Sequence, residues 1–316
     1  MLSSLSIVIP SFNECESIPH LYQRLESVLK KLAINDYEII FIDNGSTDKS
    51  LELLKELNFG NKKIKTISLS RNFGQENAIM AGIQFLKKDN LFIINGDLQD
   101  PPEILEEFIV NIEKGNDVVY GIKKKRKASI FMKFFYKLFY YAYSKTSEIE
   151  MPQQSGNVCL VNKKVLENIK NFKENVLFLR GLRTWVGFKQ VGVKYEETKR
   201  IYGNTKFSFF SSLTLALDGF FSFTLFPLRI ALLVSVFVSF CSFIYLFLLL
   251  SAKVLFFFGV ISDDFVMPKG LTAISSLLIF FSCLIIFMLG IIAEYIAKIY
   301  TEVKNRPRFI INEIIE

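Results

Sequence analysis

The chain has 316 residues, and its 38 Lys and Arg against 31 Asp and Glu give a formal net charge of +7. Apolar residues make up 51 % of the sequence, which excludes a disordered chain, and 4 cysteines are too few for a disulfide-framed secreted domain. The mean hydropathy of +0.32 is high for a chain with 22 % charged residues. We therefore expect a water-soluble part joined to a membrane part.

Strand-length apolar runs alternate with helix-patterned segments in the first part of the chain. The expected strands are residues 5–10, 38–43, 65–69, 91–95 and 117–120. The expected helices are residues 18–32, 49–57, 75–87 and 102–114. This order predicts an α/β fold with an open, mainly parallel sheet covered by helices.

Polar clusters follow three of these strands, at residues 11–14, 43–46 and 95–100. Ligands of such sheets bind beyond the carboxyl ends of the strands. Asp97 and Gln99 offer hard oxygen ligands for Mg²⁺ or Mn²⁺, and Asp43 is able to accept a hydrogen bond from a nucleobase or a ribose hydroxyl. The alternative, ordinary turn residues, explains one such cluster better than three on one edge. The G-x-G-x-x-G and P-loop patterns are both absent from the sequence.

Two later segments carry no charge, residues 230–252 and 271–293. About 20 apolar residues suffice for a helix to cross a bilayer, so we predict two transmembrane helices. Buried core helices are the disfavoured alternative, because neither segment shows a polar stripe. The start of the chain lacks the basic residues of a signal peptide, and basic residues are sparse between the spans. This distribution predicts a multi-pass protein of the inner or plasma membrane with the water-soluble part and both termini in the cytosol.

Basic and aromatic residues predict further membrane contact. A basic run at 123–127 precedes an aromatic amphipathic segment at 128–144, which suits the headgroup region of anionic lipid. Residues 207–226 form a second aromatic segment, in which Asp218 makes spanning costly, so we expect an interfacial helix there. Nucleic acid is a disfavoured partner, because the aromatics continue into the membrane part.

Ordered motifs run along nearly the whole chain: VIPSFNE at 8–14, IDNGSTD at 42–48, RNFG at 71–74, GDLQDPPE at 96–103, FLRG at 178–181, WVGF at 185–188 and GNTKF at 203–207. This ordered set, ending in two spans, resembles family 2 glycosyltransferases of the GT-A fold. It is most similar to the polyprenyl-phosphate sugar transferases, the group of bactoprenol glucosyltransferases and dolichol-phosphate mannose synthase.

The resemblance implies a Rossmann-like GT-A domain over residues 1–204 and a role for each matching residue. Asp97 would be catalytic and would bind the metal with help from Gln99. The residues implied to bind the nucleotide sugar are Pro10, Asn13, Glu14, Asp43, Arg71 and Asn95. Those implied to bind the acceptor phosphate are Lys123, Arg126 and Lys206.

Asparagine stands at three positions where the family often has aspartate: Asn44, Asn95 and Asn157. Asn157 matches the family's candidate catalytic carboxylate, and an amide cannot be a general base. A lipid phosphate has a second pKa of about 6 and is largely dianionic at neutral pH, so it needs little help from a base. Asn157 would then orient this phosphate or a sugar hydroxyl, in an inverting displacement.

The expected function is transfer of a sugar from UDP-glucose or UDP-N-acetylhexosamine to undecaprenyl phosphate at the cytosolic membrane face. A catalytically silent scaffold or sugar-nucleotide sensor is the alternative that the asparagines favour. A processive polysaccharide synthase is disfavoured, because Q-x-x-R-W is missing. The sequence leaves open which sugar is transferred and whether the chain forms a homo-oligomer.

The domain prediction is 1–204 catalytic, 205–229 interfacial linker, 230–252 first span, 253–270 external loop, 271–293 second span and 294–316 cytosolic tail.

Overall fold

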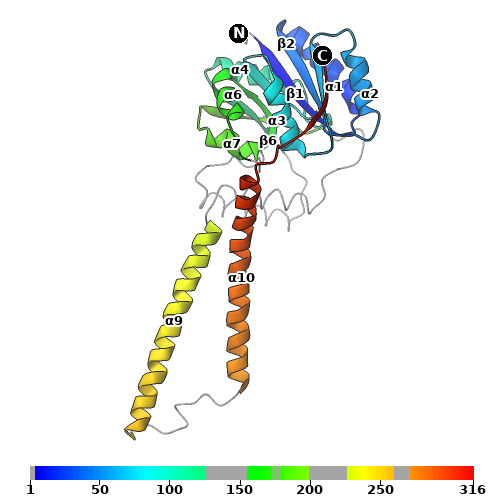
Figure 1. Cartoon of the computed structure of the whole chain (residues 1–316). Coiled ribbons are helices and arrows are strands. Elements are labelled where there is room, and N and C mark those ends of the chain that lie inside the picture. The colour runs from blue at the N-terminus through cyan, green and yellow to red at the C-terminus, as the bar shows by residue number, and fades with distance from the viewer. Residues whose placement is uncertain (1–3, 125–154, 173, 175–177, 199–225, 260–270) are drawn as a thin grey trace. The chain divides into compact units, whose positions relative to one another are not determined.

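A computed structural model describes residues 4–124, 155–172, 174, 178–198, 226–259 and 271–316 (Figure 1). The chain divides into two compact units, the first made of Met1–Ser222 with Asn305–Glu316 and the second of Phe223–Lys304. The amphipathic segments predicted at 128–144 and 207–226, the second except for Phe226, lie outside the described residues, as does most of the external loop predicted at 253–270.

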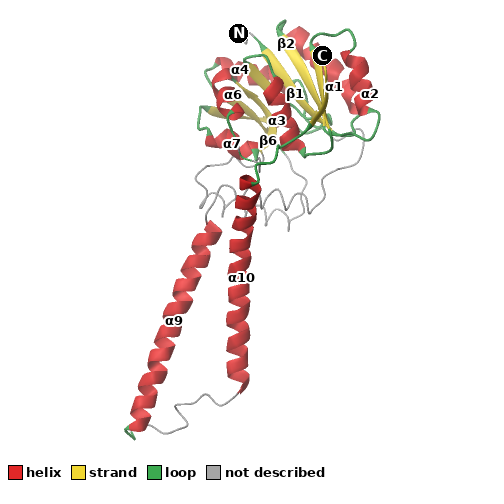
Figure 2. Ribbon diagram, in the orientation of Figure 1, coloured by secondary structure: helices red, strands yellow, loops and turns green. Residues whose placement is uncertain are grey.

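An eight-stranded sheet forms the centre of the first unit, in the order β7-β5-β6-β4-β1-β2-β3-β8 (Figure 2). Its strands are β1 (Leu5–Ser11), β2 (Tyr37–Asp43), β3 (Ile64–Leu69), β4 (Asn90–Ile93), β5 (Val118–Lys123), β6 (Ser155–Val161), β7 (Gln190–Tyr195) and β8 (Ile311–Ile315). β1 to β4 pair in parallel, and so do β5 and β7. β6 runs antiparallel to β4 and β5, and β8 runs antiparallel to β3. The sheet is therefore mixed, with the expected parallel order in its central strands.

Helices cover both faces of the sheet. They are α1 (Ser17–Lys31), α2 (Ser50–Asn58), α3 (Gln75–Phe85), α4 (Ile104–Glu113), α6 (Lys163–Lys170) and α7 (Leu179–Trp185). Leu25 of α1, Leu54 of α2 and Phe108 of α4 share one apolar core. On the opposite face, α3 contacts β1 so closely that a Cβ at Gly82 would lie 2.5 Å from Val8 Cγ1. Only glycine allows this approach at position 82. The approach places α3 directly over the central strands.

The last strand, β8, adds to the edge of β3. Ile314 pairs with Ile67, and the Ser70 amide donates to the Ile310 carbonyl across 2.9 Å. Ion pairs flank the strand, since Lys55 Nζ lies 2.7 Å from Glu313 Oε1 and Lys65 pairs with Glu316. The segment predicted as a cytosolic tail at 294–316 thus contains a strand of the central sheet.

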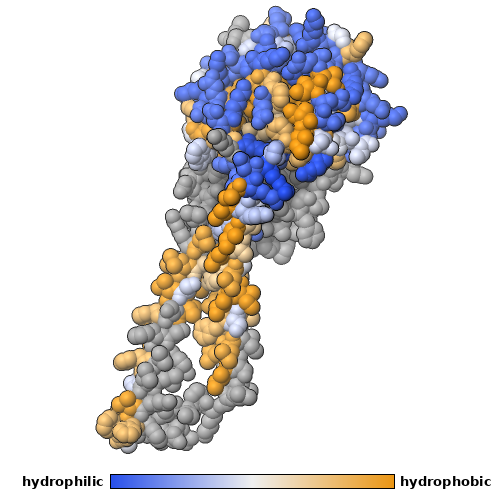
Figure 3. Space-filling model, in the orientation of Figure 1, coloured by the Kyte–Doolittle hydropathy of each residue, from blue (hydrophilic) through white to orange (hydrophobic). Residues whose placement is uncertain are grey.

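The second unit contains two long helices, α9 (Phe226–Phe257) and α10 (Leu271–Val303). Both extend beyond the uncharged windows at 230–252 and 271–293. Among the described residues, one stretch, Phe280–Val303, is long and apolar enough to cross a membrane by its length and composition. Large apolar side chains such as Ile286 and Leu289 are exposed along it (Figure 3).

Candidate active site

The loops that follow β1 and β2 are bound to each other. Asn13 has a φ of +52°, and its amide donates to Ser46 Oγ across 2.9 Å. The side-chain oxygen of Asn13 accepts from the Thr47 amide at 2.8 Å. Directly at the ends of the same two strands, the Asn44 amide donates to the Ser11 carbonyl at 2.9 Å. Because β1 and β2 are parallel neighbours, these contacts fix both polar loops at one edge of the sheet.

Two carboxylates support these loops from inside. Asp43 is 1 % exposed, and its oxygens accept from the Ser46 amide and from Ser68 Oγ, each at 3.2 Å. Glu14 is also buried and accepts from Ser17 Oγ at 3.1 Å. Both lie where the predicted nucleoside site would be, and their part in binding a nucleoside stays a prediction.

Arg71 reaches the same edge because residue 45 is a glycine. Gly45 has a φ of +72°, and a Cβ on it would lie 2.5 Å from the backbone carbon of Arg71. The Arg71 guanidinium lies 4.1 Å from the centre of the Phe73 ring and donates to the Asn72 carbonyl at 3.1 Å. Its backbone is therefore packed against the loop after β2, while its side chain is exposed.

A tight turn after β4 carries Asp97 and Gln99. The Gln99 amide donates to Asp97 Oδ1 across 3.2 Å, and Leu98 between them has a φ of +60°. Thr198, which follows β7, donates its amide to the Gln99 carbonyl at 3.0 Å and its hydroxyl to the Leu98 carbonyl at 2.5 Å. The Gly96 amide donates to the Pro10 carbonyl at 3.3 Å, which brings this turn beside the end of β1.

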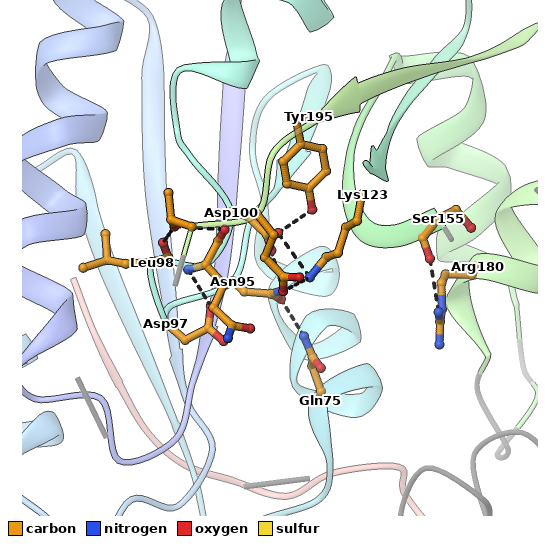
Figure 4. A network of polar contacts seen from close by, with 12 residues as sticks. Gln75, Asn95, Asp97, Leu98, Asp100, Lys123, Ser155, Arg180 and Tyr195 are labelled. Atoms are coloured by element: carbon orange, nitrogen blue, oxygen red, sulfur yellow. Dashed lines mark hydrogen bonds and ion pairs between the residues drawn. The ribbon is translucent and has the colours of Figure 1, made fainter. Parts of the chain in front are cut away.

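Asp100 is the fully buried centre of a polar network below this turn (Figure 4). It accepts from Asn95 Nδ2 at 2.7 Å and from the Tyr195 hydroxyl. The oxygen of the Asn95 side chain accepts in turn from Gln75 Nε2 at 2.5 Å. Burial and the charge of Asp100 raise the pKa of Tyr195 well above its usual range, so this tyrosine remains a donor. The network fixes the backbone that carries Asp97.

Lys123 belongs to the same network. Its ammonium lies 2.6 Å from Glu197 Oε1 and 3.6 Å from Asp100 Oδ1 (Figure 4). A lysine between two carboxylates has part of its charge neutralised, so a phosphate would compete with Glu197 for it. The other two residues predicted to bind the acceptor phosphate, Arg126 and Lys206, lie outside the described residues.

Asn157 lies on β6, next to the predicted metal turn in the sheet. β6 pairs antiparallel with β4 with Cys159 opposite Ile93, and continuing this register brings Asn157 level with Asn95. Asn157 Nδ2 donates to Glu76 Oε1 across 3.0 Å. Burial raises the pKa of the Glu76 carboxyl, while the charge of Arg180 opposes this shift.

Asp97 and Gln99 fit the donor set of a divalent cation. A carboxylate and an amide oxygen on one turn are hard ligands, and Mg²⁺ is commonly held by one or two carboxylates together with substrate phosphates. The hydrogen bond from the Gln99 amide occupies one lone pair of a carboxylate that has several. In the part of the chain that the structure describes, no cluster of three His, Cys, Asp or Glu side chains forms a metal site by itself.

The structure brings most of the predicted site residues to one edge of the sheet. These are Pro10, Asn13, Glu14, Asp43, Arg71, Asn95, Asp97, Gln99, Lys123 and Asn157, with the links given above. Sequence reasoning missed the residues that hold them, namely Gln75, Glu76, Asp100, Arg180, Arg183, Tyr195, Glu197 and Thr198. Asp100 had a signal in the GDLQDPPE motif, whereas Glu76 and Tyr195 had none.

Ligands of open α/β sheets bind beyond the carboxyl ends of the parallel strands, where this chain carries its polar loops. A model of the family described as glycosyl transferase family 2 matches residues 6–170, which is more than half of the chain. The chain belongs to this family and is a glycosyltransferase, as its motifs predicted.

Relatives match over nearly the full length. An uncharacterized glycosyltransferase, YkcC of Bacillus subtilis, is 37 % identical over 98 % of this chain and 93 % of its own. Another, sll0501 of Synechocystis, is 35 % identical over 99 % of this chain and 96 % of its own. The SfII prophage-derived bactoprenol glucosyl transferase of Shigella flexneri is 33 % identical over 98 % of this chain and 97 % of its own.

Proposed function

We propose that this glycosyltransferase transfers a sugar from a UDP-sugar to undecaprenyl phosphate at the cytosolic face of the membrane. The observation that carries the proposal is the likeness to a bactoprenol glucosyl transferase, which extends over 98 % of this chain and includes α9 and α10. UDP-glucose is the first candidate donor, and UDP-N-acetylhexosamine is the second.

The edge of the sheet provides the parts that such a transfer needs. The linked loops after β1 and β2 would hold the nucleoside through Asn13 and Asp43, with Pro10, Glu14 and Arg71 beside them. The turn after β4 would place Asp97 and Gln99 at the diphosphate. A bound Mg²⁺ or Mn²⁺ would neutralise charge that develops on the departing nucleoside diphosphate.

The reaction we propose is a single inverting displacement. An oxygen of the lipid phosphate forms a bond to C1 of the sugar while the bond from C1 to the diphosphate breaks, and its electron pair leaves with the nucleoside diphosphate. The nucleophile already carries its charge, so catalysis rests on positioning and charge stabilisation and not on a general base. Asn157 is therefore compatible with activity, and Lys123, Arg126 and Lys206 are the proposed cations for the lipid phosphate.

The membrane arrangement is part of the proposal. Residues 230–252 and 271–293 would cross the bilayer as two helices, with 253–270 outside and the catalytic unit and both termini in the cytosol. Two uncharged segments of sufficient length and the basic residues that flank them support this arrangement. The segments at 128–144 and 205–229 would bind the cytosolic headgroup region.

Transfer in membranes that contain the full chain tests the function. Radiolabelled UDP-glucose and UDP-N-acetylglucosamine are each supplied with undecaprenyl phosphate, with Mn²⁺ or with EDTA. We expect labelled lipid from one donor, loss of the product in EDTA, and a decrease of at least about 100-fold in Asp97→Ala. Glu107→Ala, an exposed carboxylate of α4, is the matched control and should keep full activity.

Two outcomes would contradict the proposal. Full activity of Asp97→Ala would remove the metal assignment. Binding of a UDP-sugar without transfer to any lipid would favour the silent scaffold or sensor, which the asparagines at positions 44, 95 and 157 make the second candidate.

A further inference from the structure

The first turn of α3 holds two asparagines of the site through adjacent residues. Gln75 donates to the side-chain oxygen of Asn95 at 2.5 Å, and Glu76 accepts from the side-chain nitrogen of Asn157 at 3.0 Å. Asn95 follows β4 and Asn157 lies in the neighbouring strand β6, so a single helix turn contacts one amide from each. The Glu76 contact joins residues that are 81 positions apart.

The Glu76 carboxyl is surrounded by groups from three elements. Its second oxygen accepts from the Leu179 amide at the start of α7 across 3.3 Å, and the charges of Arg180 and Arg183 act on it from the same helix. Arg183 is 3 % exposed and donates to the Gly156 carbonyl at 3.3 Å. A single carboxylate therefore joins α3, β6 and α7 around Asn157.

The Glu76 carboxyl determines the direction of the Asn157 amide. Both of its oxygens accept hydrogen bonds, one from Asn157 Nδ2 and one from the Leu179 amide, so the N–H₂ end of the Asn157 amide faces Glu76. The carbonyl oxygen of Asn157 is then turned away from Glu76. It is buried and has no hydrogen-bond partner among the described residues. Asn157 also lines a pocket with Ile93, Leu179 and Arg183.

We propose that Glu76 is a positioning residue of the transfer site, which holds Asn157 so that its carbonyl oxygen is presented as a hydrogen-bond acceptor. This inference rests on the proposed function. An acceptor suits a hydroxyl of the transferred sugar, which is able to donate, and does not suit the dianionic lipid phosphate, which is not. The Glu76–Asn157 contact thus assigns Asn157 to the sugar and leaves the phosphate to the cations.

Exchanging the two groups tests the proposal in the full chain in membranes. In Glu76→Gln the carboxylate charge is lost, and in Asn157→Asp two carboxylates face each other. We expect each single variant to lower kcat between about 10- and 100-fold and to raise the KM for the donor, because the sugar loses a contact that it makes on binding. The double variant Glu76→Gln/Asn157→Asp restores a donor–carboxylate pair and should recover at least about tenfold over Asn157→Asp.

Glu107→Gln, a carboxylate-to-amide change on exposed α4, is the matched control and should keep its kcat. A thermal unfolding curve for each variant identifies any that does not fold, and Glu76→Asp then replaces it as the shorter carboxylate. Unchanged kcat and KM in Glu76→Gln would overturn the proposal. So would strictly multiplicative effects in the double variant, because residues that act through one contact are not independent.

The failure of the proposed function is recognised separately. It would appear as a wild-type chain that transfers no sugar to lipid from any donor. Calorimetry then tests Glu76 without turnover. If Asn157 contacts the sugar, the wild type should bind UDP-glucose more tightly than UDP, and Glu76→Gln should lose this preference. Equal preference in wild type and Glu76→Gln would overturn the inference.

Discussion

The hydroxyl of Tyr195 in β7 donates a hydrogen bond to the carboxylate of Asp100, 95 residues earlier in the chain and directly after the turn that carries Asp97. Asp100 is fully buried, and Tyr195 is 6 % exposed. The contact therefore joins the edge strand β7 to the predicted metal turn.

Replacing Tyr195 by phenylalanine should lower both stability and activity. The change removes a donor from a buried carboxylate, and such a loss costs about 1–3 kcal/mol of unfolding free energy. Because the Asp97 turn is held by the same network, we expect a reduced kcat as well. Denaturant unfolding and the transfer assay measure the two effects. Tyr37→Phe is the control, and an equal loss in both variants would mean that the Asp100 contact has no particular weight.

Gly45→Ala should be more damaging than Gly60→Ala. Both glycines have a positive φ, +72° and +80°, so both substitutions introduce the same kind of backbone strain. A Cβ at position 45 also collides with the Arg71 backbone at 2.5 Å, whereas nothing lies within 4 Å of one at position 60. Strain alone costs about 1–3 kcal/mol, and the collision adds to it only at Gly45. Thermal unfolding of the two variants compares them directly, and equal midpoints would contradict the packing described here.

Removing residues 309–316 should destabilise the first unit, because it exposes the edge of β3 and leaves buried Lys65 without its Glu316 partner. The single variant Glu313→Gln breaks one partly exposed ion pair with Lys55, which is worth about 0–1 kcal/mol. We expect a large decrease of the unfolding midpoint for the deletion and little change for Glu313→Gln. Similar midpoints for the deletion and the wild type would show that β8 does not stabilise the sheet.

Two glutamates should affect the pH dependence of stability in opposite directions. Burial raises the pKa of Glu76 above its usual 4.5, so its contribution to stability is present below that pH and is lost as the pH rises through the raised pKa. The hydrogen bond from Lys65 lowers the pKa of Glu316, so its contribution is present above pH 4.5 and is lost as the pH falls through the lowered pKa.

Unfolding curves measured across pH separate these two contributions. Glu76→Gln should flatten the stability profile above pH 4.5, and Glu316→Gln should flatten it below pH 4.5. The assignment of Glu76 is contradicted if Glu76→Gln keeps the wild-type dependence of stability on pH above pH 4.5. The assignment of Glu316 is contradicted if Glu316→Gln keeps it below pH 4.5.

The alternation of strands and helices up to residue 120 could be predicted because each element has its own local pattern. Helix α1 was expected at 18–32 and lies at Ser17–Lys31, and strand β2 was expected at 38–43 and lies at Tyr37–Asp43. Strand β8 could not be predicted, because its five residues follow a long helix and become a strand only by pairing with β3. The antiparallel direction of β6 likewise depends on its neighbours and not on its own residues.

The sequence by itself determined the family, the polar clusters at strand ends and the two uncharged segments, because motif order and local hydrophobic pattern are properties of the chain alone. Only the tertiary structure decided which groups hold those clusters in place. Glu76, Asp100 and Tyr195 come from a helix, a turn and a distant strand, and no spacing in the sequence relates them. Their roles arise from burial, because a carboxylate removed from water requires donors, and folding brings those donors from remote parts of the chain.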